Sequence, residues 1–260
     1  SEMCIRDRCT SSRWRIRKGS IMKIINAGVT APKGFKCAGL RAGVKSGKTN
    51  KDMAMIVSEV PAKIAGTFTK NIVKAAPVLW GKKIVEEQEA VRAVVINTGI
   101  ANACTGAQGY ENVVTEAKEV AKLLDIKPEE VVVGSTGVIG QQLPMDVIKE
   151  GIKKLVPELK ADRQSEEDAS WAILTTDTKP KEAAVEVEIN GKTVTIAGMC
   201  KGSGMIHPNM GTMLGFITTD AAIDKALLLE LQRELIEDTF NMVSVLSLIH
   251  ISEPTRLGMI

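Results

Sequence analysis

Short apolar runs alternate with amphipathic segments along the middle of the chain. Runs bounded by polar or glycine residues favour buried strands at 53–57, 93–96 and 131–133. Between the last two, apolar residues recur at helical spacing from 111 to 124, which predicts an amphipathic helix. The pattern therefore predicts strands that alternate with helices.

The next segment has two helix-start signals. Pro144 is predicted to begin a helix whose inward face carries Met145, Ile148, Ile152 and Leu155. Ser165 is predicted to cap a second helix, because the carboxylates at 166–168 would stabilise the positive end of its dipole.

A β-hairpin is predicted beyond these helices. Apolar residues alternate with polar ones before and after Asn190-Gly191, a pair typical of a type I′ turn. A buried strand at 213–217 and a helix from Asp224 through Phe240 follow. An antiparallel hairpin with covering helices predicts an α+β fold, a layered sandwich of mixed and antiparallel sheets covered by helices.

Composition excludes several classes of protein. The chain has 260 residues, of which 44% are hydrophobic and 25% charged, with a net charge of +3. This balance is typical of soluble globular proteins, and no apolar run approaches the roughly 18 residues of a membrane span. Neither a basic cluster nor a set of stacking aromatics favours nucleic-acid binding.

The five cysteines do not indicate a metal site. They lack CxxC spacing and partner histidines, so they are interpreted as free thiols in a reducing cytoplasm, and no metal or cofactor is expected. For Cys104, the role of a small buried core side chain is favoured over that of a nucleophile.

The glycine-rich segment 43–49 resembles a phosphate-binding loop only partly. Three residues instead of four separate its glycines, and no apolar strand precedes it. A solvated hairpin turn is favoured over a nucleotide site.

Both ends of the chain differ from its middle. Residues 1–21 are rich in arginine and lysine without the apolar core of a secretory signal. Residues 243–260 follow a predicted helix without a clear structural role. We expect both tails to be non-native, resembling translated adapter sequence, and the authentic part to be 22–242.

The strongest chemical signal is the Gly211-Thr212 junction, between a glycine-rich loop and an apolar strand. A threonine hydroxyl in this position could attack the preceding carbonyl, where glycine leaves the approach open. The freed α-amino group of Thr212, with a pKa of about 7.7–8.0, could then act as the general base. The chain has only two histidines, His207 and His250, which disfavours histidine-dependent hydrolases.

Three other segments carry candidate groups. The loop 134–140 follows a predicted strand, where backbone N–H groups and the Thr136 hydroxyl could stabilise an oxyanion. Thr175 lies at a predicted helix end, where a hydroxyl often only satisfies a carbonyl. Lys201 could bind a carboxylate, although an isolated lysine is usually only solvated.

Four motifs, 97–106, 135–140, 175–178 and 201–214, resemble the glutamate N-acetyltransferase (ornithine acetyltransferase) family of arginine biosynthesis in order and spacing. The resemblance covers nearly all of 22–242. It implies a self-cleaving fold with an N-terminal threonine nucleophile, cut into an α chain (22–211) and a β chain that starts at 212 and runs here to 242. It also implies a heterotetramer of two α and two β chains.

The resemblance further implies the chemistry and its residues. Thr212 would take acetyl from N-acetylornithine and pass it to glutamate without an obligatory cofactor, and acetyl-CoA stays open as an alternative donor. Thr136 and Gly137 would form the oxyanion hole. Thr175, Lys201 and Thr212 would contact the substrate.

Two departures from the family pattern concern single residues: Gly211 replaces alanine and Ile100 replaces asparagine. A third is the end of the chain, where the family's second half of the β chain would follow, so we expect the 260-residue chain itself to be inactive. Two other classes stay open: a self-processing amidohydrolase or aminopeptidase of related fold, and a small-ligand binding protein in which Thr212 only begins a strand.

Overall fold

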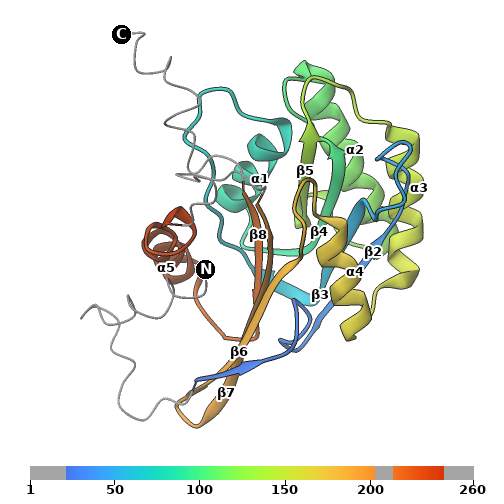
Figure 1. Cartoon of the computed structure of the whole chain (residues 1–260). Helices are drawn as coiled ribbons and strands as arrows, with labels where there is room; N and C mark the ends of the chain where they lie inside the picture. Colours follow the sequence, from blue (N-terminus) through green and yellow to red (C-terminus); the bar gives the residue numbers. More distant parts are fainter. Residues whose placement is uncertain (1–21, 203–212, 243–260) are drawn as a thin grey trace, which may run out of the picture.

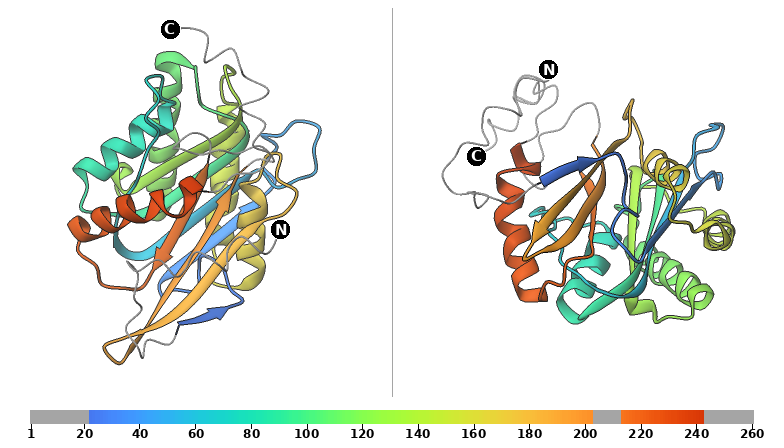
Figure 2. Two further views of the ribbon diagram at one scale, coloured as in Figure 1. Left: turned by 60° about the vertical axis from the view of Figure 1, so that its left-hand side comes forward. Right: turned by 90° about the horizontal axis from the view of Figure 1, so that it is seen from below.

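Two four-stranded sheets pack face to face, with helices on both outer sides, in the computed structural model of the chain (Figures 1 and 2). The structure describes residues 22–202 and 213–242. The order of layers is three helices, the first sheet, the second sheet and a single helix. The predicted layered α+β fold is thus confirmed.

The first sheet has the spatial order β2-β3-β4-β5. Its strands are β2 (Phe35–Leu40), β3 (Met53–Lys63), β4 (Ala90–Ile100) and β5 (Val131–Val138). The pair β4 and β5 is parallel, while the other neighbours are antiparallel. A parallel pair needs a crossover connection, which α2 (Gly106–Leu124) supplies. The carboxyl ends of β4 and β5 therefore lie side by side.

The second sheet is antiparallel and has the order β1-β6-β7-β8. Its strands are β1 (Met22–Ile25), β6 (Lys181–Ile189), β7 (Lys192–Lys201) and β8 (Leu214–Thr219). The β6–β7 hairpin turns at Asn190 and Gly191, whose φ angles of 52° and 73° are those of a type I′ turn. The predicted hairpin is confirmed.

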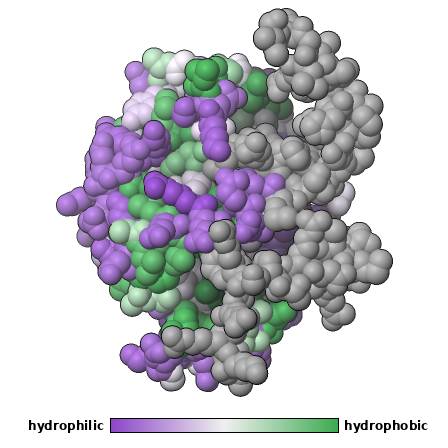
Figure 3. Space-filling view, turned by 90° about the vertical axis from the view of Figure 1, so that its left-hand side faces the viewer, coloured by the Kyte–Doolittle hydropathy of each residue, from purple (hydrophilic) through white to green (hydrophobic). Residues whose placement is uncertain are grey.

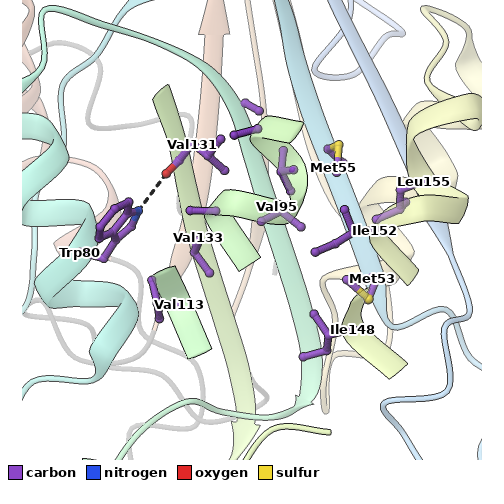
Figure 4. Close-up of a cluster of buried hydrophobic side chains, with 14 of the residues drawn as sticks. Met53, Met55, Trp80, Val95, Val113, Val131, Val133, Ile148, Ile152 and Leu155 are labelled. Carbon is purple, nitrogen blue, oxygen red and sulfur yellow. Dashed lines mark hydrogen bonds between the residues drawn. The ribbon is translucent and has the colours of Figure 1, made fainter. Parts of the chain in front are cut away.

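Three helices cover the outer face of the first sheet: α1 (Ala76–Glu87), α2 and α3 (Met145–Leu155). Aliphatic side chains fill the space between them and the sheet, and Figure 4 shows this cluster. Trp80 of α1 lies at its edge, where the indole Nε1 donates a hydrogen bond of 2.9 Å to the Val131 carbonyl. This bond satisfies the one polar atom of a large buried ring.

A second apolar cluster lies between the two sheets. It joins Ile56 and Ile96 of the first sheet to Met199 of the second, and α4 (Arg163–Ala172) contributes Ala169 and Ala172. α4 packs on β2 and β3, and the carbonyl of its last residue, Ala172, accepts a hydrogen bond from Thr98 of β4.

The outermost layer is α5 (Lys225–Glu237), beside the second sheet (Figure 2). No residue of α5 is buried. Figure 3 shows this face, on which hydrophilic and apolar patches alternate, and the exposed apolar side chains of β8 and α5 include Ile217, Leu227 and Leu235. Three short 3-10 turns, Pro128–Glu130, Val156–Glu158 and Phe240–Met242, complete the elements.

The predicted helices are present, with corrections at their ends. α2 begins at Gly106 instead of 111, and α5 ends at Glu237 instead of Phe240. Pro144 precedes α3, and Ile148, Ile152 and Leu155 are fully buried. Ser165 does not cap α4. The cap is Asp162, whose carboxylate accepts a hydrogen bond of 2.8 Å from the Ser165 amide, so α4 begins three residues earlier than predicted. Within 22–202 and 213–242, no helix is long and apolar enough to cross a membrane.

Candidate functional site

The parallel strands β4 and β5 end in a close backbone contact. Gly99 pairs with Gly137, and a Cβ at Gly137 would overlap the Gly99 carbonyl. The φ of Gly137 is 142°, a conformation that side chains rarely adopt. Only glycine fits here, so the backbone after Thr136 has a fixed position at the sheet end.

Thr175 follows the C-terminal end of α4, which two hydrogen bonds hold against the first sheet. The Thr98 hydroxyl donates to the Ala172 carbonyl at 2.9 Å, and Lys45 Nζ donates to the Leu174 carbonyl at 2.7 Å. Both bonds come from outside the helix. The second bond fixes Leu174, the residue immediately before Thr175.

Lys201, the last residue of β7, connects the end of β5 at Thr136 with Thr175, which follows α4. Its side chain is only 5% exposed, and Nζ donates to the Thr136 hydroxyl at 3.1 Å and to the Thr175 hydroxyl at 2.8 Å. Three residues predicted from separate motifs therefore meet at one point. Gly137 adjoins them through Thr136.

The Lys201 ammonium is an unusual group to bury. Burial lowers its pKa, while the negative charge of Asp177 opposes that shift and the positive charge of Lys181 adds to it. In the part of the chain that the structure describes, no carboxylate lies within ion-pairing distance of Lys201, and Asp177 pairs with Lys181 instead. An ammonium has three donor protons, and two of them have hydroxyl acceptors here. The remaining proton suits an anionic ligand.

The predicted cleavage junction belongs to a segment that starts and ends at this site. Gly202 precedes the segment 203–212, and β8 begins at Leu214, which pairs with Lys201. Gly211, Thr212 and His207 themselves lie outside the described residues. The roles of Gly211 and Thr212 stay predictions.

The sequence predicted only a solvated turn at 43–49. In the structure, the loop 41–52 also contacts the candidate site. The buried Asp52 carboxylate accepts hydrogen bonds from the amides of Ala42, Gly43 and Lys45. This folds the loop so that Lys45 Nζ reaches the Lys51 and Leu174 carbonyls. Burial lowers the pKa of Lys45, and the charges of Lys48 and Lys201 lower it further against the opposing effect of Asp52.

The sequence patterns gave no role to Lys45 or Asp52, and Asp177 stood out only within the motif 175–178. The Asp177 carboxylate is fully buried and accepts hydrogen bonds from Lys181 Nζ and the Gly202 amide. A small cavity of about 90 Å³ lies between Lys45, Trp171, Thr175 and Asp177. The one available signal was the position of Asp177, two residues after a predicted site threonine.

The prediction for Cys104 was wrong. Its side chain is exposed, and its φ of 57° places it in a left-handed turn before α2, which directs the side chain to solvent. Among the described residues, no group of three or more histidine, cysteine, aspartate or glutamate side chains could hold a metal ion.

Comparison with known sequences decides the family. The sequence model of the ArgJ family matches residues 36–247, most of the chain. The chain belongs to the ArgJ family. Similar relatives are the arginine biosynthesis bifunctional proteins ArgJ of Symbiobacterium thermophilum, 51% identical over 225 residues, and of Lactococcus lactis, 50% identical over 227 residues. Each alignment covers 86% of this chain and 55% of the relative, so the chain spans about half the length of these ArgJ proteins.

Solved structures agree with the fold. The ArgJ protein of Bacillus halodurans has 40% identity and a TM-score of 0.69. The ornithine acetyltransferase of Mycobacterium tuberculosis, solved in complex with ornithine, has 38% identity and a TM-score of 0.67. Both comparisons cover 75% of this chain and all of the solved chain.

Proposed function

We propose that the protein transfers the acetyl group of N-acetylornithine to glutamate, giving ornithine and N-acetylglutamate. The observation that carries this proposal is the buried Lys201 ammonium, bound to two hydroxyls and to no carboxylate among the described residues. An ion of this kind is costly to bury unless a counterion joins it. Both substrates carry an α-carboxylate that fits this role.

The acetyl group passes through Thr212 in two steps. The Thr212 hydroxyl attacks the acetyl carbonyl, its proton passes by way of its own α-amino group to the leaving nitrogen, and ornithine departs. The glutamate amine then attacks the acetyl-threonine and restores the free hydroxyl. In this proposal the Thr136 hydroxyl, which accepts from Lys201, keeps its own proton to donate to the oxyanion, with the Gly137 N–H as the second donor.

Self-cleavage between Gly211 and Thr212 precedes the transfer. The Thr212 hydroxyl attacks the Gly211 carbonyl, the amide becomes an ester, and water hydrolyses that ester to free the α-amino group. The lengths of the solved chains support this. All of each solved chain is covered by 75% of this chain, and the interval 22–211 is also about three quarters of it. We extend the proposal to a heterotetramer of two α and two β chains.

The test is an acetyl-transfer assay on the full-length protein that carries this chain. N-Acetylornithine and glutamate are supplied together, and N-acetylglutamate is measured by mass spectrometry. A second reaction omits glutamate, and a third replaces N-acetylornithine with acetyl-CoA. N-Acetylglutamate formed only when glutamate is present supports the transferase, and product in the third reaction adds acetyl-CoA as a donor.

Two other outcomes contradict the proposal. Acetate and ornithine released at the same rate without glutamate indicate an amidohydrolase. An uncut chain that binds substrate without turnover indicates a binding protein. The matched variants Lys201→Met and Lys192→Met separate the site from general charge effects, because Lys192 is an exposed residue of the same strand. We expect a loss of about 100-fold in kcat/KM for the first variant alone.

A further inference from the structure

Asp177 lies in the turn between α4 and β6, two residues after Thr175. Its side chain is completely buried. One oxygen, Oδ1, accepts hydrogen bonds from both the Lys181 ammonium, at 2.6 Å, and the Gly202 amide, at 3.0 Å. The other, Oδ2, has no hydrogen-bond partner among the described residues. A buried carboxylate of this kind has a specific structural or chemical role more often than an exposed one.

The first consequence concerns the backbone. Gly202 is the residue at which the chain leaves β7, immediately before the segment that contains the Gly211-Thr212 junction. Its amide is bound to Asp177, and its carbonyl accepts a longer hydrogen bond of 3.4 Å from Lys181. These contacts fix the peptide that follows Lys201. Asp177 thus sets the direction in which the chain enters the segment 203–212.

The second consequence concerns charge. Burial favours the neutral form of Lys201, and the nearby negative charge of Asp177 favours the ammonium. Lys181 acts in the opposite sense, because it is a like charge. Lys45 is a second cation close enough to interact with Lys201. Burial alone would raise the pKa of Asp177 itself, but the hydrogen bonds from Lys181 and Gly202 lower it, so Asp177 is a carboxylate.

We propose that Asp177 is a positioning residue of the acetyl-transfer site: it anchors the Gly202 backbone at the entrance to the cleavage segment, and its negative charge stabilises the buried ammonium of Lys201. This inference rests on the proposed function. It assigns to Asp177 an effect on self-cleavage through the backbone and an effect on substrate binding through Lys201.

The electrostatic part predicts opposite shifts for two variants. Asp177→Asn removes the negative charge and keeps an oxygen that can accept from Gly202. Lys181→Met removes the like charge from a residue that is half exposed. Lys201 must be protonated to bind a carboxylate, so the alkaline limb of kcat/KM follows its ionisation. We expect that limb to shift to lower pH by about 0.5–1 pH unit in Asp177→Asn and to shift to higher pH in Lys181→Met.

Asp168→Asn is the matched control. Asp168 also pairs with a lysine, Lys51, but it lies on α4 away from Lys201. Its alkaline limb should stay at the wild-type pH. A merely structural role for Asp177 would lower kcat without moving the two limbs in opposite directions.

The backbone part is measured by the time course of cleavage of the freshly made precursor, followed by intact mass. Asp177→Ala, which removes the acceptor for Gly202, should slow cleavage at least tenfold, and Asp177→Asn should cleave much faster than Asp177→Ala. If Asp177→Ala does not fold, the pH profiles of Asp177→Asn and Lys181→Met still decide. If the wild type is cleaved and active but the profiles of these two variants do not shift, or shift in the same direction, this inference is overturned and the proposed function stands. A wild type that forms no N-acetylglutamate overturns the proposed function instead.

Discussion

Gly137 and Gly99 lie so close across the parallel pair β4–β5 that a Cβ on Gly137 would overlap the Gly99 carbonyl. The contact holds the Thr136-Gly137 peptide at the sheet end, next to the Lys201 ammonium. A rigid backbone at this point suits a group that must stabilise charge only while it develops.

Gly137→Ala should therefore lower stability and kcat by more than the strain in its backbone conformation alone would cause. Gly140 provides the control, because it also has a positive φ but nothing lies within 4 Å of its Cβ position. We expect Gly140→Ala to cost about 1 kcal/mol of stability with little change in kcat. Gly137→Ala should cost several kcal/mol and lower kcat about 100-fold. Equal effects of the two variants in denaturation and kinetics would show that the Gly99 contact is unimportant.

The buried side chain of Glu116 should make the stability of the protein depend on pH. It is fully buried on α2, and neither carboxylate oxygen has a hydrogen-bond partner in the described part of the chain. Burial raises its pKa to about 8. The folded protein therefore keeps a proton that the unfolded chain releases near pH 4.5. Its contribution to stability is complete below that pH and is lost as the pH rises through about 8.

Glu116→Gln mimics the neutral form and should remove this dependence. Between pH 5 and 8, the free energy of unfolding of the wild type should fall relative to the variant by about 1.4 kcal/mol per pH unit. Glu111→Gln, an exposed position on the same helix, should run parallel to the wild type. Urea denaturation across this pH range provides the measurement. Parallel curves for the wild type and Glu116→Gln would mean that Glu116 is not a protonated core residue.

Lys45→Met should weaken substrate binding at a distance from the reacting atoms. The change removes the hydrogen bonds to the Lys51 and Leu174 carbonyls, and the second of these holds the residue before Thr175. We expect kcat/KM to fall about tenfold, mainly through KM, because Thr175 loses its fixed position. Lys48→Met removes the same charge from the same loop and should leave both parameters near their wild-type values. Steady-state kinetics with each substrate varied decides between the loop charge and the specific contact.

The sequence predicted the elements with strong periodicity and missed those fixed by long-range contacts. The hairpin at Asn190-Gly191 and the α3 face were predictable because local turn chemistry and apolar spacing specify them. The edge strand β1 was not, since its partner β6 lies far along the chain. Ser165 and Asp162 both lie near the start of α4, and only the backbone geometry shows which one caps it.

The residues of the candidate site also fall into two groups: those that motifs predicted and those that only the structure reveals. The motifs supplied Thr136, Thr175 and Lys201, and the structure brings both threonine hydroxyls within hydrogen-bond distance of the Lys201 ammonium. The place of Lys45 could not be predicted, because it depends on how the Asp52 carboxylate folds the loop 41–52. Glycine spacing in that loop indicated a turn and gave no sign that its lysine reaches the end of α4.

Intact mass of the full-length wild type and of Thr212→Ala, measured side by side, tests the central claim most directly. Self-cleavage predicts two fragments in the wild type that meet at Gly211/Thr212, and one uncut chain in the variant. A single uncut wild-type chain would contradict the account, because without cleavage Thr212 has no free α-amino group to act as the base.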